Sequence, residues 1–140
     1  MGTWGPGNFE NDCAADHLYA LCAPLLEAVE QAMADPELIQ PDEEDGDLVP
    51  ANLEIIACLS EYLGRYEHGD LAKMLSPCLL PPPETVARWK QIYLGVWDAN
   101  IDGLDPDPEY KRQRREVLVK TFDRVERLAH ELAEDEPTEE

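Results

Sequence analysis

Apolar residues recur at the spacing of an α-helix in four stretches of this chain, and this periodicity limits the fold more than any other feature. The stretches cover residues 12–34, 51–66, 84–98 and 108–134. In the last of them the apolar positions alternate between steps of four and three, as in a helix packing seam: Leu118, Phe122, Val125, Ala129 and Leu132. No run of alternating, β-branched residues competes with this pattern. The sequence therefore predicts an all-α fold, a compact bundle of four or five helices that forms a single domain over residues 1–134. The acidic residues 135–140 are expected to form a disordered tail.

Prolines and acidic runs indicate where these helices should bend, start and stop. Pro24 cannot donate the backbone hydrogen bond of an interior helical residue, so the first stretch should either kink there or divide into two helices. Residues 35–50 are expected to form a linker in which Leu38 and Ile39 pack on the core and the run DEEDGD is a solvated loop. Residues 51–66 should be the central helix, because they are apolar on two faces. One face holds Leu53, Ile56, Ala57 and Leu63, and the other holds Ile55, Leu59, Tyr62 and Tyr66.

The first ten residues contain a glycine-rich turn between two aromatic residues. Gly5, Pro6 and Gly7 let the backbone reverse, the glycines through their freedom in φ and the proline through its fixed φ. This reversal should bring Trp4 and Phe9 to one side of the turn. Burial of both rings would hold down a terminus that would otherwise fray, so the turn is expected to be an aromatic anchor on the bundle.

A helix start follows directly after the turn. Asn11 or Asp12 can accept a hydrogen bond from the free N–H groups of a helix that begins at Cys13, and Asp16 lies near the positive end of its dipole. These acids are therefore accounted for by helix capping. The functional alternative is that Asp12 and Asp16, one turn apart with His17 beside them, form half of a metal or catalytic site.

The opening of this chain resembles a family of small bacterial domains of unknown function. Its members begin Gly-x-Trp-Gly-x-Gly-x-Phe-x-Asn-Asp and continue Ala-x-Asp. The matching residues here are Gly2, Trp4, Gly5, Gly7, Phe9, Asn11, Asp12, Ala15 and Asp16. The resemblance extends more weakly through the acidic linker and the central apolar helix. It implies a shared compact fold and assigns no catalytic or binding residues.

Acidic residues dominate the first half of the chain. Residues 1–64 contain 14 Asp and Glu and no Lys or Arg, whereas residues 65–140 contain 17 acids and 11 bases, for a net charge of −20. Such a field repels nucleic acid and anionic membranes and speeds encounter with a basic protein. The alternative is that the acidity serves solubility alone. The one basic cluster is expected to neutralise acids of the same fold: Lys111, Arg112, Arg114 and Arg115.

Several absences favour a cytoplasmic location. No apolar run approaches the roughly 18 residues of a membrane-spanning helix, and the N-terminus lacks the basic and hydrophobic segments of a secretory signal. The spacing of the cysteines contains no Cys-x-x-Cys, so Cys13, Cys22, Cys58 and Cys78 are expected to be free thiols that are mostly buried. No phosphate loop, nucleophile elbow or paired histidine motif is present.

One motif indicates a particular ligand. Residues 98–109 fit the calcium-loop pattern of an EF-hand. Gly103 would permit the sharp turn of such a loop. The expected oxygen donors are Asp98, Asn100, Asp102, the backbone carbonyl of Leu104, and both carboxylate oxygens of Glu109. A calcium ion is therefore the one cofactor that the sequence suggests.

The same segment departs from the EF-hand pattern and has a simpler interpretation. Asp105 stands where an aliphatic residue is usual, Pro106 and Pro108 stiffen the second half of the loop, and the chain has no second loop. In the simpler interpretation Asn100 and Gly103 end one helix, and Asp107 caps the next.

These observations predict a non-catalytic protein-binding module. Its most specific version is an antitoxin-like or immunity-like inhibitor of a basic partner protein, with no role in binding nucleic acid or membranes. The first alternative is a helical protein with a single EF-hand-like calcium site in residues 98–109. The second is an enzyme that uses Asp12 and Asp16.

Overall fold

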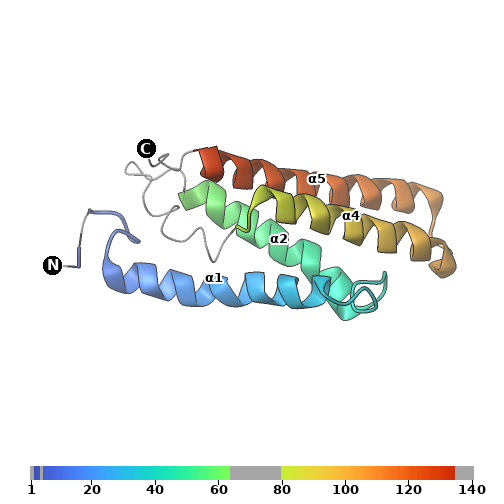
Figure 1. Ribbon diagram of the computed structural model, residues 1–140, viewed down its shortest axis with the longest axis horizontal. Helices are drawn as coiled ribbons and strands as arrows, with labels where there is room; N and C mark the ends of the chain where they lie inside the picture. The colour runs from blue at the N-terminus through green and yellow to red at the C-terminus, as the bar shows by residue number, and fades with distance from the viewer. Residues whose placement is uncertain (1, 4, 64–79, 135–140) are drawn as a thin grey trace.

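The described part of the chain forms four α-helices that lie side by side along the long axis of the molecule (Figure 1). The computed structural model describes residues 2–3, 5–63 and 80–134. Apart from one isolated antiparallel bridge between Thr3 and Asn11, these residues contain no β structure. The prediction of an all-α bundle is confirmed. Its elements are α1 (Asp12–Met33), α2 (Glu44–Leu63), α4 (Pro83–Asn100), the 3₁₀ helix η1 (Ile101–Leu104) and α5 (Pro108–Glu134).

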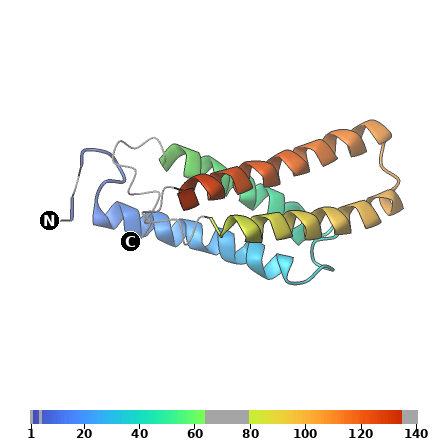
Figure 2. The same ribbon diagram turned by 45° about the horizontal axis from the view of Figure 1, so that its top comes forward.

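The helices form a ring in the order α1, α2, α5, α4. Helix α2 packs against both α1 and α5, and α4 packs against α5, whereas α1 and α4 contact each other only briefly. The connection between α1 and α2 and the connection between α4 and α5 lie at the same end of the bundle, away from the N-terminus (Figures 1 and 2). Three of the four helix–helix interfaces are therefore extensive, and the fourth, between α1 and α4, is small.

The core follows the periodicity of the sequence most closely in α5. Leu118, Phe122 and Val125 are fully buried, Ala129 is buried beside them, and Leu132 packs against the core from its edge. Phe122 contacts Tyr93 of α4, with ring centroids 5.4 Å apart. The packing seam predicted for this helix is therefore confirmed.

Helix α1 runs through Pro24 without a break. The expectation that a second helix begins near Pro24 is wrong, since a single helix spans Asp12–Met33. Pro24 leaves the carbonyl of Ala20 without its helical donor, but both residues lie on the exposed side of α1, where water can take the donor's place. An exposed proline therefore interrupts one hydrogen bond and leaves the helix continuous.

Helix α2 begins at Glu44, well before the start at residue 51 that the sequence predicts, so most of the run DEEDGD is helical and not a loop. Asp42 takes a left-handed backbone conformation, with φ of 77°, just before the helix. Glu44, Asp45 and Asp47 then lie in the first turn, where negative charge stabilises the helix dipole. The acidic run thus starts a helix.

A three-residue arrangement holds the start of α2 in place. Pro50 lies inside the helix and cannot donate a hydrogen bond to the carbonyl of Gly46, four residues earlier. The hydroxyl of Tyr93, on α4, donates to this buried carbonyl in its place. A Cβ atom at position 46 would collide with the backbone oxygen of Gln40, so only glycine fits there. Burial raises the pKa of the Tyr93 hydroxyl to about 12.

Three further expectations need correction. Ile39 is fully buried as expected, but Leu38 is 40% exposed. Helix α2 is not enclosed on both apolar faces, because Ile55 and Tyr62 are each 46% exposed, and Tyr66 lies outside the described residues. Of the cysteines, Cys22 is buried, but Cys13 and Cys58 are exposed, and Cys78 lies outside the described residues.

Candidate functional site

The N-terminal turn is closed by a buried carboxylate that sequence reasoning missed. Glu10 is 8% exposed, and its Oε1 accepts a hydrogen bond of 3.0 Å from the backbone N–H of Gly7. The N–H of Glu10 in turn donates to the carbonyl of Gly7. A Cβ atom at Gly5 would collide with the Glu10 carboxylate, so the glycine makes room for it. The spacing of three between Gly7 and Glu10 is the one signal in the sequence for this contact.

Phe9 anchors the turn on the bundle as predicted. Its partly buried ring packs against the core and meets the ring of Tyr62 edge-on, with centroids 6.4 Å apart. Trp4, the other predicted anchor, lies outside the described residues. Phe9 therefore ties the N-terminal turn to the end of α2.

The acids of the first helical turns act locally. Asn11 is the N-cap of α1, since its Oδ1 accepts a hydrogen bond of 2.9 Å from the N–H of Ala14. Asp12, Asp16 and His17 are exposed on the first turns of α1. Within the described ranges, no group of three or more His, Cys, Asp or Glu side chains is placed to hold a metal ion. The pair Asp12 and Asp16 thus has no third ligand from another described element.

The residues of the calcium-loop pattern form a helix corner. Helix α4 continues through Asp98 and Asn100 because Trp97 and Ile101 are buried and draw the backbone into a helical turn. Both carboxylate oxygens of Asp98 accept hydrogen bonds from Arg115, each 2.9 Å long. These hydrogen bonds hold the pKa of Asp98 below its usual value. The side chain of Asn100 donates back to the carbonyl of Val96.

The remaining residues of the pattern have partners on α5. Asp102 pairs with Lys111 at 2.7 Å, and Glu109 accepts hydrogen bonds from Arg112 and Gln113. Asp107 caps α5 through the N–H of Glu109, as the simpler interpretation of the sequence predicts. The three acids among the expected calcium ligands are thus each bonded to a different donor of their own fold. A calcium cage from Asp98, Asn100, Asp102, Leu104 and Glu109 is not assembled in this arrangement and would need the corner to refold.

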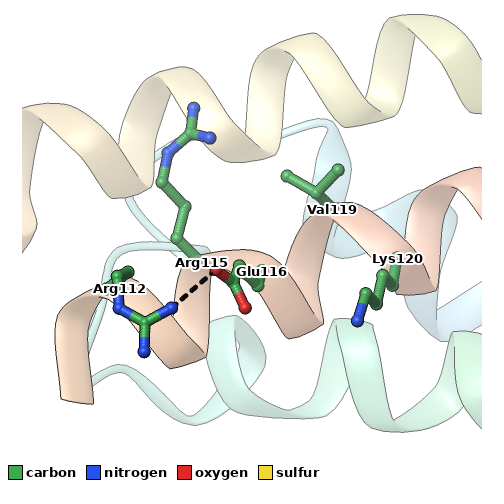
Figure 3. Close-up of a pocket in the computed structure, with 5 residues that line it drawn as sticks. All are labelled: Arg112, Arg115, Glu116, Val119 and Lys120. Carbon is green, nitrogen blue, oxygen red and sulfur yellow. Dashed lines mark hydrogen bonds and ion pairs between the residues drawn. The ribbon is translucent and has the colours of Figure 1, made fainter. Parts of the chain in front are cut away.

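Three residues of the basic cluster of α5, Lys111, Arg112 and Arg115, form ion pairs with acids of the same fold, in line with the prediction. Arg112 and Arg115 also line a wide, open hollow of about 420 Å³. Figure 3 shows Arg115 reaching toward α4, while Arg112 is bonded to Glu116 on its own helix at 2.8 Å. Lys120 is the lining cation that has no ion pair within the described residues. The residues that line the hollow are Arg112, Arg115, Glu116, Val119 and Lys120.

The outer face of α2 is exposed, although sequence reasoning assigned two of its residues, Ile55 and Tyr62, to an apolar core face. Five exposed residues run along it in steps of three and four, and we call them the outer seam of α2: Leu48, Ala51, Ile55, Cys58 and Tyr62. The buried side of the same helix carries Val49, Leu53, Ile56, Ala57 and Leu63. The two faces differ in exposure and not in apolar character, so the helical pattern alone could not separate them.

Acids without an ion pair within the described residues are concentrated in the same half of the chain. Eleven of the fourteen acids in residues 1–64 have no ion-pair partner within residues 5–63 and 80–134. They are Asp16, Glu27, Glu30, Asp35, Glu37, Asp42, Glu43, Glu44, Asp45, Asp47 and Glu54. In contrast, Glu61 accepts a hydrogen bond of 2.6 Å from Arg124 of α5, an arrangement that raises the pKa of the arginine.

Fold and surface together define an acidic, all-α bundle, and its described residues contain no group of side chains placed to hold a metal ion. No helix among those residues combines the length and the apolar composition that crossing a membrane requires. The chain belongs to the family described as "Domain of unknown function (DUF4259)", which matches residues 2–139. Comparison with curated proteins and with solved structures found no match.

Proposed function

We propose that this chain is a non-catalytic protein-binding module that binds a basic partner protein, in the manner of an antitoxin or an immunity protein. The observation that carries the proposal is the set of eleven acids on the α1–α2 half of the bundle that have no ion pair within residues 5–63 and 80–134. An acidic surface without internal counter-charges attracts a basic protein over long range and speeds its association.

The pairing pattern supports binding over solubility alone. Six of the nine described Lys and Arg form ion pairs, and all six lie on α4 and α5. The α1–α2 half has no base of its own with which to neutralise its acids. Large apolar side chains are also exposed among these acids, including Tyr19 and Leu21 of α1 and Ile55 of α2. Solubility requires the acids and does not require the apolar side chains beside them.

The test is affinity capture from an extract of the native cells at low and at high salt. The expected result is a basic protein whose recovery falls as the salt concentration rises, because salt screens the attraction. A matched pair of triple variants separates the location of charge from its total. Glu27→Gln, Glu30→Gln and Glu54→Gln neutralise unpaired acids of α1 and α2, whereas Glu84→Gln, Asp105→Asn and Glu126→Gln remove the same charge from the other half.

The first triple variant should lose the basic protein and the second should retain it. Equal losses in both variants would mean that bulk charge alone attracts the captured protein, and would overturn the proposal. Capture of no salt-sensitive basic protein would overturn it as well.

A further inference from the structure

We infer that the outer seam of α2 is the surface on which a basic, amphipathic helix of the partner docks, lying along α2 as one helix of a two-stranded coiled coil. The inference rests on the proposed function and adds to it the surface and the chemistry of the partner.

The apolar part of the surface has the repeat of a coiled coil. Leu48, Ile55 and Tyr62 are seven residues apart, and Ala51 and Cys58 lie between them at steps of three. Heptad positions a and d have this spacing, and the side chains at these positions insert between those of a facing helix. Leu48 is 44% exposed and Ile55 is 46% exposed, so the described helices leave this side of α2 open. The repeat covers most of the length of α2.

The charged part of the surface is a line of acids that runs parallel to the seam. Asp47, Glu54 and Glu61 each directly precede one of the three a positions, which places them at position g. Charges at e and g form ion pairs between the two helices and set the choice of partner. Asp47 and Glu54 have no ion pair within the described residues, whereas Glu61 is held by Arg124. A complementary helix therefore needs Lys or Arg beside its own apolar seam.

A second copy of this chain does not meet this requirement. Helix α2 contains no Lys or Arg, so two copies in antiparallel order would place acids opposite acids. In parallel order the acids would face Asn52 and Leu59, at position e, which offer no charge. The charge pattern thus favours a different, basic protein over self-association.

The probe for this surface is a synthetic helical peptide of three heptads with Leu at positions a and d and Lys at positions e and g. Two control peptides are compared with it, one of the same composition in scrambled order and one with Glu in place of Lys. Titration calorimetry on the full chain measures each affinity. We expect the aligned basic peptide to bind at least about tenfold more tightly than either control.

Two variants of the chain place the binding on the seam. Ile55→Asp should weaken binding of the aligned basic peptide by about tenfold or more, because a charge replaces the central apolar contact. Leu104→Asp adds the same charge at a residue of η1 that is 49% exposed, and it should leave the affinity unchanged. Glu54→Lys, at position g beside the seam, should reduce the preference for the Lys peptide over the Glu peptide. Circular dichroism melting checks that each variant is folded.

Equal binding of the aligned and scrambled peptides would overturn the inference, because it would mean that net charge alone attracts them. Equal effects of Ile55→Asp and Leu104→Asp would also overturn it. Sedimentation equilibrium of the chain alone should give a monomer, and a dimer abolished by Ile55→Asp would assign the seam to a second copy instead. If the capture experiment succeeds while the peptide experiment fails, the proposed function stands and only the docking surface is wrong.

Discussion

The two halves of this bundle treat their surface charge in opposite ways. Helices α4 and α5 hold most of their acids in ion pairs, such as Lys90 with Asp123 at 2.6 Å and Arg115 with Asp98 at 2.9 Å. Helices α1 and α2 leave eleven acids without an ion pair in the described part of the chain. Among the described residues nine large apolar side chains are exposed, and six of them lie in residues 5–63.

This contrast separates two uses of a charged surface. A half that pairs its own charges has little attraction left for a partner, since each pair already cancels its field at short range. A half that combines unpaired acids with exposed apolar residues offers both long-range attraction and apolar contact area. Net charge alone, at −20, does not show which half carries the binding surface.

The largest expected effect is on the free energy of unfolding, and it distinguishes two adjacent isoleucines of α2. Ile56 is fully buried and Ile55 is 46% exposed. Ile56→Ala should lower the free energy of unfolding by about 3 kcal/mol, because it removes packed methyl groups and leaves a cavity. Ile55→Ala should lower it by less than about 1 kcal/mol. Urea denaturation measures both, and equal losses would mean that the outer seam belongs to the core.

The next effect concerns Tyr93, which joins the two halves. Tyr93→Phe should lower the free energy of unfolding by about 2 kcal/mol, because it leaves the buried carbonyl of Gly46 without a hydrogen-bond donor. Unfolded tyrosine loses its proton near pH 10, whereas folded Tyr93 keeps its proton up to a pKa of about 12. The stability from this group is therefore complete below pH 10 and falls as the pH rises from 10 to 12.

Urea denaturation of the wild type and of Tyr93→Phe at pH 9 and at pH 11.5 checks this prediction. The gap between the two proteins should narrow at the higher pH, since the wild type alone loses the Tyr93 contribution. A constant gap would show that the hydroxyl is not buried against Gly46.

A loss of similar size is expected for the N-terminal anchor. Phe9→Ala should cost about 2 kcal/mol, less than a fully buried phenylalanine, because the ring is only partly covered. Thermal melting gives the change in stability, with Asn8→Ala as the exposed control. If Phe9→Ala melts like the wild type, the opening turn would belong to the binding surface and not to the fold.

The difference in charge pairing between the two halves predicts that single charge changes alter the free energy of unfolding by less than about 1 kcal/mol. Asp98→Asn should destabilise the chain slightly at pH 7, because it breaks the paired hydrogen bonds with Arg115. Since the pKa of Asp98 is lowered, this contribution is present above about pH 4 and is lost as the pH falls further. Glu54→Gln should be neutral or slightly stabilising, as it relieves repulsion between unpaired acids. Denaturation curves at pH 7 and at pH 3 measure both variants, and destabilisation by Glu54→Gln would contradict the contrast.

No specific effect is expected from calcium. Any divalent ion gathers weakly near a surface of this charge, so the useful measurement is the preference for calcium over magnesium in titration calorimetry. We expect no such preference and no change on Glu109→Gln, because Glu109 is bonded to Arg112 and Gln113. A micromolar calcium constant that Glu109→Gln abolishes would show that the corner refolds into an EF-hand-like loop.

Helices α4 and α5 were predictable from the sequence for a physical reason. In α4 and α5 the apolar spacing, the prolines and the caps agree, so local pattern and packing lead to the same helices. Asp107 as a cap and the neutralised basic cluster follow from neighbours close in sequence. The seam from Leu118 to Leu132 faces the core because it is the one apolar face of its helix.

The start of α2 was not predictable in the same way. A proline at position 50 and a glycine at position 46 are ordinary signals against a helix. Their effect is reversed by Tyr93, a residue distant in sequence that supplies the missing hydrogen bond. The outer seam was misjudged for a related reason, since apolar spacing identifies a face that can be covered and does not say whether the covering helix belongs to the same chain.

The brief contact between α1 and α4 has a consequence for how the native bundle opens to solvent. Met33 and Trp89 line a hollow of about 310 Å³ along this side, whereas Phe122 is enclosed by the other helices. Unfolding of α1 alone would leave the packing of α5 against α2 and α4 intact, so it costs less than global unfolding. In hydrogen exchange, amides of α1 should therefore be labelled through such partial openings. Amides around Phe122 should be labelled only when the whole domain unfolds.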